Sequence, residues 1–494
     1  MSTQQDSAAI KEKAISSVKW AGLSVILPRF ISPLVTIIVG QRLAPEDFGI
    51  VGIAIALNTF ADIIVGYNWG QAIIRSEENV NDVANISFWM MGILSIILYG
   101  IFWFLAPAVA AGYKNPFLVT VIRLISLTII ISATSLVPKA LMEREFRYQH
   151  LFVVRTVSTT LTNIVILIWV FIAPSIWVIV AQPILIAVTQ SFTSYYLTKW
   201  RPQIYWNWKQ AKQIISFNSV IIFATFITWV LIYGDNLFAG ALLGATQLGI
   251  YVLGWNLALI IPNIVSGSVG QVAYTTFSRF KDEQERVGLQ FIHLQRLFSI
   301  ILFPISAGIA IIAQPLAQII YGENWGALPT VMMLLSLMTI FTFLWNLNEL
   351  AFRAIGRPML GVIAPILLIA YGAPALFMFG RDDVIAYSLT RTLIMVPFPF
   401  MVMVVTQYAF GISVLKQMQA IAWPFIITAM MFGLGYFCLQ AFGPLTNVRH
   451  LPQVGLIIII CAAFYGLMMF IFQRPLMLQI RDMFMSNLKR RNAT

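Results

Sequence analysis

The chain contains an internal repeat with an offset of about 200 residues, and the repeat lies within an almost continuous series of apolar segments. Residues 39–57 (VGQRLAPEDFGIVGIAIAL) align with residues 239–257 (AGALLGATQLGIYVLGWNL), and Gly49 falls at the same place as Gly249. Secondary transporters are often built from two similar helical bundles in one chain, with the substrate path between them. The repeat therefore points to transport.

The composition requires a membrane environment. Hydrophobic residues make up 59% of the 494 residues and charged residues 10%, whereas a soluble domain carries about 25% charged residues. A helix needs about 20 apolar residues to cross the hydrocarbon core, and on this measure the chain has about 14 spans. We expect an all-α integral membrane protein with two pseudo-symmetric six-helix bundles and two further C-terminal helices.

The basic charge follows from the topology. The net charge is +12, and with a cytoplasmic N-terminus most Lys and Arg residues fall in cytoplasmic turns or at their borders, Lys139 among them. This asymmetry is the positive-inside rule, and it predicts that both termini are cytoplasmic. Because the topology accounts for the basic charge, we do not expect a nucleic-acid partner. The polar start of the chain, with Lys11 and Lys13, is unlike a cleavable signal peptide.

The predicted spans divide the chain into four parts. Residues 1–198 form an N-terminal lobe with spans one to six, and residues 214–410 a C-terminal lobe with spans seven to twelve. Residues 411–494 hold two extra spans and a basic cytoplasmic tail. Between the lobes, residues 199–213 (KWRPQIYWNWKQAKQ) alternate basic and aromatic residues, which favours a cytoplasmic connector in the headgroup layer over a docking site.

The sequence shows no arrangement of residues that an enzyme or a metal protein would need. Cys438 and Cys461 both lie in apolar segments, and the three histidines are not clustered with other metal-ligand residues. No predicted loop is long enough for a soluble catalytic domain, and no loop carries an acid pair or a nucleophile with its base. We expect no enzymatic activity, no catalytic residue, no metal site and no cofactor.

Charged residues within the predicted spans are the main candidates for function. A charge at the centre of a membrane helix costs about 2.5–3.5 kcal/mol, so such residues usually face an internal cavity. The cations outnumber the acids, which favours an anionic substrate in an aqueous cavity. The candidate substrate-binding residues are Arg29, Asp62, Arg123, Arg155, Arg296 and Arg391.

Arg29 is the strongest of these candidates. It lies near the middle of the first span, between Pro28 and Pro33, which are expected to kink the helix. A guanidinium at this depth suits bidentate binding of phosphate. The alternative is a structural ion pair with Asp62 at similar depth in the second span, and both roles can hold together. The other four arginines lie close enough to an interface that they either line the path or reach out to the headgroups.

The acids within the spans are candidates for ion coupling. They are Asp62, Asp235 and Glu349, since intramembrane carboxylates can carry a proton or a cation. For Asp235 the structural alternative is to cap or pair with a nearby arginine or with Asn236.

Several segments resemble the polysaccharide-transporter flippases of the multidrug/oligosaccharidyl-lipid/polysaccharide exporter superfamily, and most closely its colanic-acid exporter (Wzx) branch. These segments are GDNLFAGALLGATQLGIYVLGWNLALIIPN (234–263), FSRFKDEQER (277–286), YGENW (321–325), AIGRP (354–358) and PKALMEREFRY (138–148). In many relatives the Ala-Asp of the second span continues into an acidic turn. Here Ala61-Asp62 is followed by Val65-Gly-Tyr-Asn68, so no coupling acid in that turn carries over.

The resemblance implies a flippase of the bacterial inner membrane. It would move undecaprenyl-diphosphate-linked polysaccharide repeat units, as for lipopolysaccharide or exopolysaccharide, from the cytoplasmic to the periplasmic leaflet by alternating access. The implied partners are this lipid-linked oligosaccharide, membrane lipids, and the polysaccharide polymerase and export machinery. The alternative is an ion-coupled multidrug exporter of the same superfamily, although cationic drugs would favour more buried acids than arginines. A membrane polymerase or ligase would need a large external loop.

Overall fold

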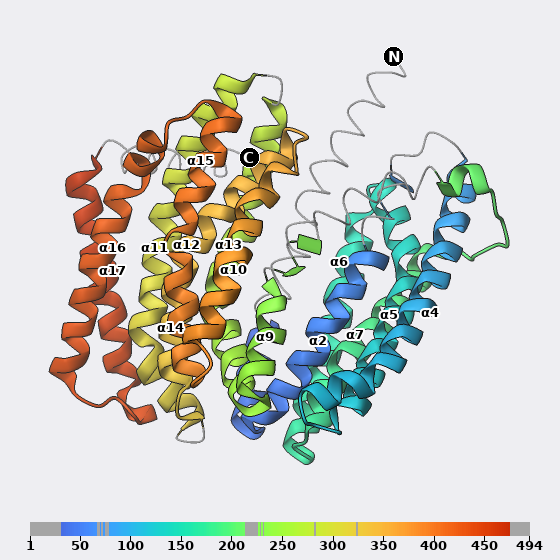
Figure 1. Ribbon diagram of the computed structural model, residues 1–494, viewed down its shortest axis with the longest axis horizontal. Coiled ribbons are helices and arrows are strands. Elements are labelled where there is room, and N and C mark those ends of the chain that lie inside the picture. The colour runs from blue at the N-terminus through green and yellow to red at the C-terminus, as the bar shows by residue number, and fades with distance from the viewer. Residues whose placement is uncertain are drawn as a thin grey trace, which may run out of the picture. The chain divides into compact units, whose positions relative to one another are not determined.

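The computed structural model describes residues 31–66, 70, 73–74, 79–212, 226–227, 229–230, 232–280, 283–322 and 325–474 (Figure 1). Within these ranges the chain forms helices and short connections, and none of the described residues belongs to a strand. The predicted all-α membrane fold is confirmed.

Twelve segments of the described residues are long and apolar enough to cross a membrane. Each corresponds to one predicted span. The two remaining predicted spans, centred near residues 29 and 227, fall mostly outside the described residues. The twelve segments are Pro45–Val65, Val80–Gly112, Leu118–Arg144, Tyr148–Ile172, Ile176–Thr198, Ala245–Gly267, Gln284–Tyr321, Leu328–Ala354, Leu360–Phe379, Val384–Phe410, Val414–Phe442 and Val448–Phe472.

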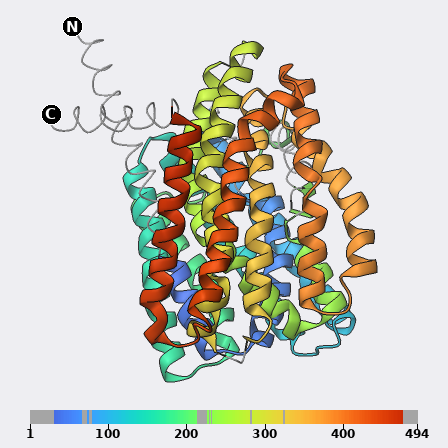
Figure 2. The same cartoon turned by 90° about the vertical axis from the view of Figure 1, so that its left-hand side faces the viewer.

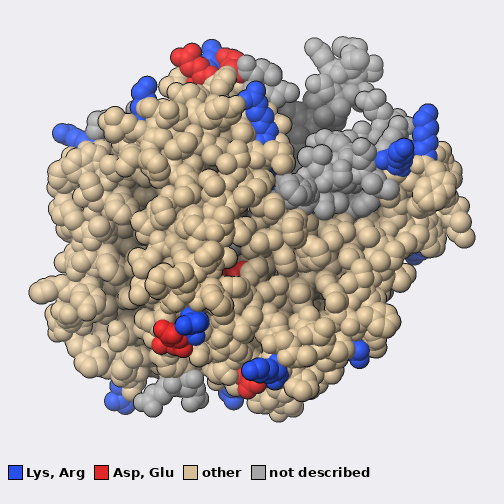
Figure 3. All heavy atoms as spheres, in the orientation of Figure 1, with Lys and Arg blue, Asp and Glu red and all other residues tan. Residues whose placement is uncertain are grey.

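The helices form two compact units. The first consists of residues 1–253 and 381–387, and the second of residues 254–380 and 388–494. The predicted lobes, 1–198 and 214–410, stay a prediction. On the face seen in Figure 3, charged side chains lie mostly near the helix ends, and the middle of the helices is almost free of them. This distribution suits helices whose middle parts face hydrocarbon.

The first unit is built around a central helix. Its helices are α2 (Pro45–Val65), α4 (Val80–Gly112), α5 (Leu118–Arg144), α6 (Tyr148–Ile172), α7 (Ile176–Thr198), α9 (Gly234–Leu243) and the first turns of α10 (Ala245–Arg279). Helix α5 packs against α2, α4, α6 and α7. Its buried positions alternate between aliphatic residues and small ones such as Ser126, Ala133 and Ser135, which let helices approach closely in a membrane.

Two glycines related by the sequence repeat pack against each other within this unit. A Cβ atom on Gly49 of α2 would lie 1.8 Å from the carbonyl oxygen of Ala245, and one on Gly249 of α10 would lie 1.6 Å from that of Pro45. Pro45 and Ala245 are also equivalent by the repeat, so the contact is reciprocal. Only a residue without a side chain allows the two backbones to meet at this distance.

The second unit is organised around the long helix α11 (Gln284–Tyr321). This helix contacts α12 (Leu328–Ala354), α15 (Phe398–Phe410), α16 (Val414–Phe442) and α17 (Leu451–Phe472). The unit also holds the rest of α10, α13 (Leu360–Phe379), most of α14 (Val384–Met395) and the 3₁₀ turn η2 (Val448–His450). Figures 1 and 2 show α16 and α17, the two extra spans, side by side at one edge of this unit.

Candidate substrate site

The first unit gathers charged side chains from three helices. Lys139 of α5 interacts electrostatically with Asp62 of α2, with Glu143 one turn further along α5, and with Arg155 of α6. The Nζ atom of Lys139 also donates a hydrogen bond of 2.6 Å to Oε1 of Gln190 on α7. We refer to Asp62, Lys139, Glu143, Arg155 and Gln190 as the charge cluster.

The charge cluster combines partly buried cations with an open acid. Lys139 and Arg155 are half-buried, whereas Asp62 is exposed. The cluster contains two cations and two carboxylates. Since a cation within a span needs an anionic or polar partner, an anion that replaced the carboxylates would satisfy Lys139 and Arg155 equally well.

Helices α5, α6 and α7 of the first unit also carry neutral polar side chains that bond to one another. Asn163 of α6 is 1% exposed; it donates to the hydroxyl of Ser32 at 3.3 Å and accepts from Gln182 of α7 at 3.2 Å. The hydroxyls of Thr134 and Ser191 lie 2.9 Å apart on α5 and α7. These groups are satisfied within the protein, as buried polar groups must be.

Arg29 lies outside the described residues, so its predicted role and its predicted pairing with Asp62 stay predictions. Within the described part of the chain, Asp62 interacts electrostatically with Lys139. The sequence interpretation assigned Lys139 to the cytoplasmic border and missed it as a site residue. The available signal was the apolar run around it, Leu136-Val137-Pro138 before and Ala140-Leu141-Met142 after.

Arg123 also lies on α5, but its contacts are separate from the charge cluster. Its guanidinium carbon sits 4.2 Å from the ring centroid of Trp103 on α4, and its Nε donates to the carbonyl oxygen of Trp103 at 3.3 Å. Trp103 is 39% exposed. A cation stacked on a partly exposed aromatic ring is well placed to anchor two helices to each other.

Asp235 is held by two tyrosine hydroxyls. Tyr387 donates to Oδ1 of Asp235 at 2.7 Å and to its backbone oxygen at 3.1 Å, and Tyr251 donates to the other carboxylate oxygen. Both tyrosines are at most 1% exposed. Asp235 lies in the first turn of α9, where a negative charge is also favoured by the helix dipole. Neither tyrosine was predicted as a partner.

The remaining predicted residues lie in the second unit. Arg391 of α14 is 6% exposed and interacts electrostatically with Tyr371 of α13. Arg296 of α11 is half-buried, and none of the other described residues forms a hydrogen bond or ion pair with it. Glu349 forms an ion pair with Arg353 one turn further along α12.

Of the predicted site residues, Asp62 and Arg155 each interact electrostatically with Lys139. The other described ones have separate surroundings. Within the described part of the chain, no group of three or more His, Cys, Asp or Glu side chains is placed to hold a metal ion.

Two characterised relatives are similar over most of this chain. The teichuronic acid biosynthesis protein TuaB of Bacillus subtilis (strain 168) is 20% identical over 434 residues, which are 86% of this chain and 88% of that protein. The lipopolysaccharide biosynthesis protein WzxC of Escherichia coli (strain K12) is 20% identical over 343 residues, or 68% of this chain and 69% of that protein.

Two solved structures share the fold. The lipid II flippase MurJ, in an inward closed conformation, matches with a TM-score of 0.72 at 11% identity and covers 92% of this chain and 99% of that one. An inward-facing multidrug resistance MATE transporter matches with a TM-score of 0.61 at 14% identity, over 84% of this chain and 98% of that one. At such identities the likeness establishes the fold alone. The model of a protein family described as "Polysaccharide biosynthesis protein" matches residues 39–329, which are more than half of the chain. This protein therefore belongs to that family.

Proposed function

We propose that this protein is a flippase that moves undecaprenyl-diphosphate-linked polysaccharide repeat units from the cytoplasmic to the periplasmic leaflet of the bacterial inner membrane. Family membership and the relatives in polysaccharide biosynthesis support the substrate class. The positive-inside distribution supports cytoplasmic termini. A transporter of this kind needs no covalent catalysis, and its partners would be the lipid-linked oligosaccharide, membrane lipids and the polymerase and export machinery.

The observation that carries the proposal is that Lys139 interacts electrostatically with both Asp62 and Arg155 and donates a hydrogen bond to Gln190. In the structure Lys139 interacts with the carboxylates of Asp62 and Glu143 and with the guanidinium of Arg155. A lipid diphosphate brings several charged oxygens, which arginine binds bidentately and lysine binds as a point charge. It would therefore take the place of the carboxylates at Lys139 and Arg155, and the sugars would occupy the aqueous side.

This exchange also supplies what alternating access requires. A substrate shifts a conformational equilibrium only by its difference in affinity for the two states. A diphosphate that releases Asp62 from Lys139 gives the loaded and empty proteins different internal contacts. Asp62, Asp235 and Glu349 are then candidates for binding the ion that returns the empty protein to its starting conformation. Arg29, Arg123, Arg296 and Arg391 stay candidates for contacts elsewhere along the path.

The test is complementation of a host that lacks its own flippase. Wild type, Lys139→Met, Lys139→Arg and Arg29→Ala are expressed at matched membrane levels, and surface polysaccharide and lipid-linked intermediate are quantified. Loss of a charge-assisted contact worth about 1.5–3 kcal/mol lowers transport by about tenfold or more. We expect Lys139→Met and Arg29→Ala to accumulate intermediate and Lys139→Arg to retain most transport.

A matched control is Lys416→Met, which removes an exposed lysine from α16. Transport by Lys139→Met at the level of wild type would refute the role of the charge cluster. Wild type that restores no polysaccharide but raises resistance to cationic drugs would establish the multidrug exporter instead.

A further inference from the structure

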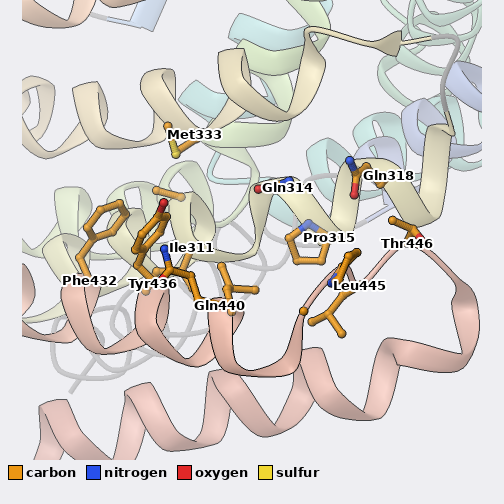
Figure 4. Close-up of a pocket in the computed structure, with 14 residues that line it drawn as sticks. Ile311, Gln314, Pro315, Gln318, Met333, Phe432, Tyr436, Gln440, Leu445 and Thr446 are labelled. Carbon is orange, nitrogen blue, oxygen red and sulfur yellow. The ribbon is translucent and has the colours of Figure 1, made fainter.

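The second unit contains a pocket of about 360 Å³ that the transport site does not involve (Figure 4). It lies between α11, α12 and α16 and is closed at one end by the loop that follows α16. The predicted orientation places this loop on the periplasmic side. We refer to the pocket as the amide pocket. Its volume is in the range of sites for small ligands.

The lining of the amide pocket is mostly apolar, and the polar side chains set into it are all neutral. Gln314 and Gln318 project from successive turns of α11, and Gln440 and Tyr436 from successive turns of α16 (Figure 4). Thr446 adds a hydroxyl from the loop, and none of the described lining residues is charged. The amide side chains of the three glutamines form no hydrogen bonds with other described residues, so their donors and acceptors are free for a ligand.

The backbone around the pocket is fixed by two glycines of the α16 region. A Cβ on Gly435 would lie 2.5 Å from Cδ1 of Ile311, so α11 and α16 are in close contact beside the pocket. Gly443 ends α16 with a φ of 72°, and its N–H donates to the carbonyl oxygen of Gln440 at 3.3 Å. Both contacts hold the glutamine-bearing turns in place before any ligand binds, which reduces the entropy cost of binding.

The chemistry of the lining selects among ligands. A phosphate or carboxylate would favour a cation, and a cationic drug would favour an acid or an aromatic cage. Primary amides, by contrast, offer donors and acceptors together, which matches hydroxyl groups that both donate and accept. Tyr436, 56% exposed, and Phe432 provide aromatic surface for the apolar C–H face of a ring.

We propose that the amide pocket binds a sugar residue through its hydroxyl groups. The sugar can belong to a lipid-linked oligosaccharide on the outer side of the membrane, which rests on the function proposed above, or to a free glycan. In the first case the pocket holds the glycan after the lipid diphosphate has left the charge cluster.

Photo-crosslinking in intact cells tests this proposal. The photoreactive residue p-benzoylphenylalanine replaces either Phe432, which lines the pocket, or Phe437, which is on the same helix, is 68% exposed and does not line the pocket. Cells are labelled with tritiated sugar and with radioactive phosphate, and both labels are measured on the purified protein. We expect the probe at position 432 to capture several times more sugar label than the probe at position 437.

The two labels identify the source of the ligand. Sugar together with phosphate indicates the lipid-linked oligosaccharide, and sugar without phosphate indicates a free glycan; both support the proposal, and only the first also supports the flippase function. Phosphate without sugar at position 432 indicates a phospholipid headgroup and overturns the proposal, as does equal sugar label at the two positions. Each of the changes Gln314→Leu and Gln440→Leu, at exposed positions, should lower sugar capture by about fivefold through the loss of one hydrogen bond.

Discussion

The hydroxyl of Tyr387 donates a hydrogen bond of 2.7 Å to the carboxylate of Asp235, a residue 152 positions earlier in the chain. Tyr251 donates to the same carboxylate from α10. The chain passes from the first unit to the second after Leu253 and again after Tyr387. Tyr251 lies two residues before the first of these places, and Tyr387 is the second. Asp235 therefore fixes both of these passages to α9.

Removal of one of these hydroxyls should destabilise the first unit. Tyr387→Phe loses a buried hydrogen bond to a charged group, and we expect a loss of about 1–2 kcal/mol in the free energy of unfolding. Thermal unfolding of the purified protein measures the change. Tyr408→Phe is the control, because Tyr408 is 81% exposed. Equal unfolding temperatures for the two variants would contradict the prediction.

Asp235→Asn separates a structural role from ion coupling. An amide still accepts a hydrogen bond from one tyrosine but carries no charge. If Asp235 serves only to hold the tyrosines, transport and stability should fall together, as in Tyr387→Phe. A variant as stable as wild type that has lost transport would instead establish ion coupling at Asp235.

Alanine at Gly49 or Gly249 should disrupt the packing of α2 on α10. The added Cβ would lie 1.8 Å or 1.6 Å from a backbone oxygen, which cannot move aside as a flexible side chain can. We expect each variant to lose about 1–3 kcal/mol of stability or more. Gly100→Ala in α4 is the control, since nothing lies within 4 Å of the added atom. It should be neutral or slightly stabilising. Normal unfolding temperatures for both packing variants would show that the helices do not meet in this way.

The stacking of Arg123 on Trp103 should be measurable as a coupling energy. A double-mutant cycle with Arg123→Leu and Trp103→Leu is expected to give about 0.5–1 kcal/mol. Arg474 and Phe470, whose guanidinium carbon and ring centroid are 6.0 Å apart, form the control pair and should couple more weakly. If Arg123→Leu abolishes transport without any such coupling, Arg123 acts on the substrate, as the sequence predicted, and not as an anchor.

Neutralising Asp62 should strengthen the binding of an anion at Lys139. Because the carboxylate of Asp62 attracts the same ammonium group electrostatically, Asp62→Asn is expected to bind undecaprenyl diphosphate several times more tightly in detergent, while transport slows. Asp382→Asn, in an exposed turn, should leave binding unchanged. Weaker binding by Asp62→Asn would mean that the acid supports the cation and does not compete with the substrate.

Much of the fold follows from apolar patterning alone. Twelve predicted spans correspond to twelve helical segments, because a run of about 20 apolar residues has few alternatives in a membrane chain. The repeat also aligned Gly49 with Gly249, and these two glycines pack against each other.

The partners of the charged residues could not be read from the sequence. Which side chain faces Asp62 depends on the rotation of α2 and α5 about their axes, and apolar runs that are hydrophobic on all sides do not reveal this rotation. Lys139 was therefore overlooked as its partner. For the same reason Tyr251 and Tyr387, which lie 136 residues apart in the chain, could not be assigned to one carboxylate.

The reciprocal glycine contact has an evolutionary consequence. Gly49 meets the backbone at Ala245, and Gly249 meets it at Pro45, as in an interface where two identical surfaces face each other. An ancestral chain of half this length would have made the same contact with a second copy of itself. Gene duplication and fusion would then have preserved the interface of a former homodimer inside one polypeptide.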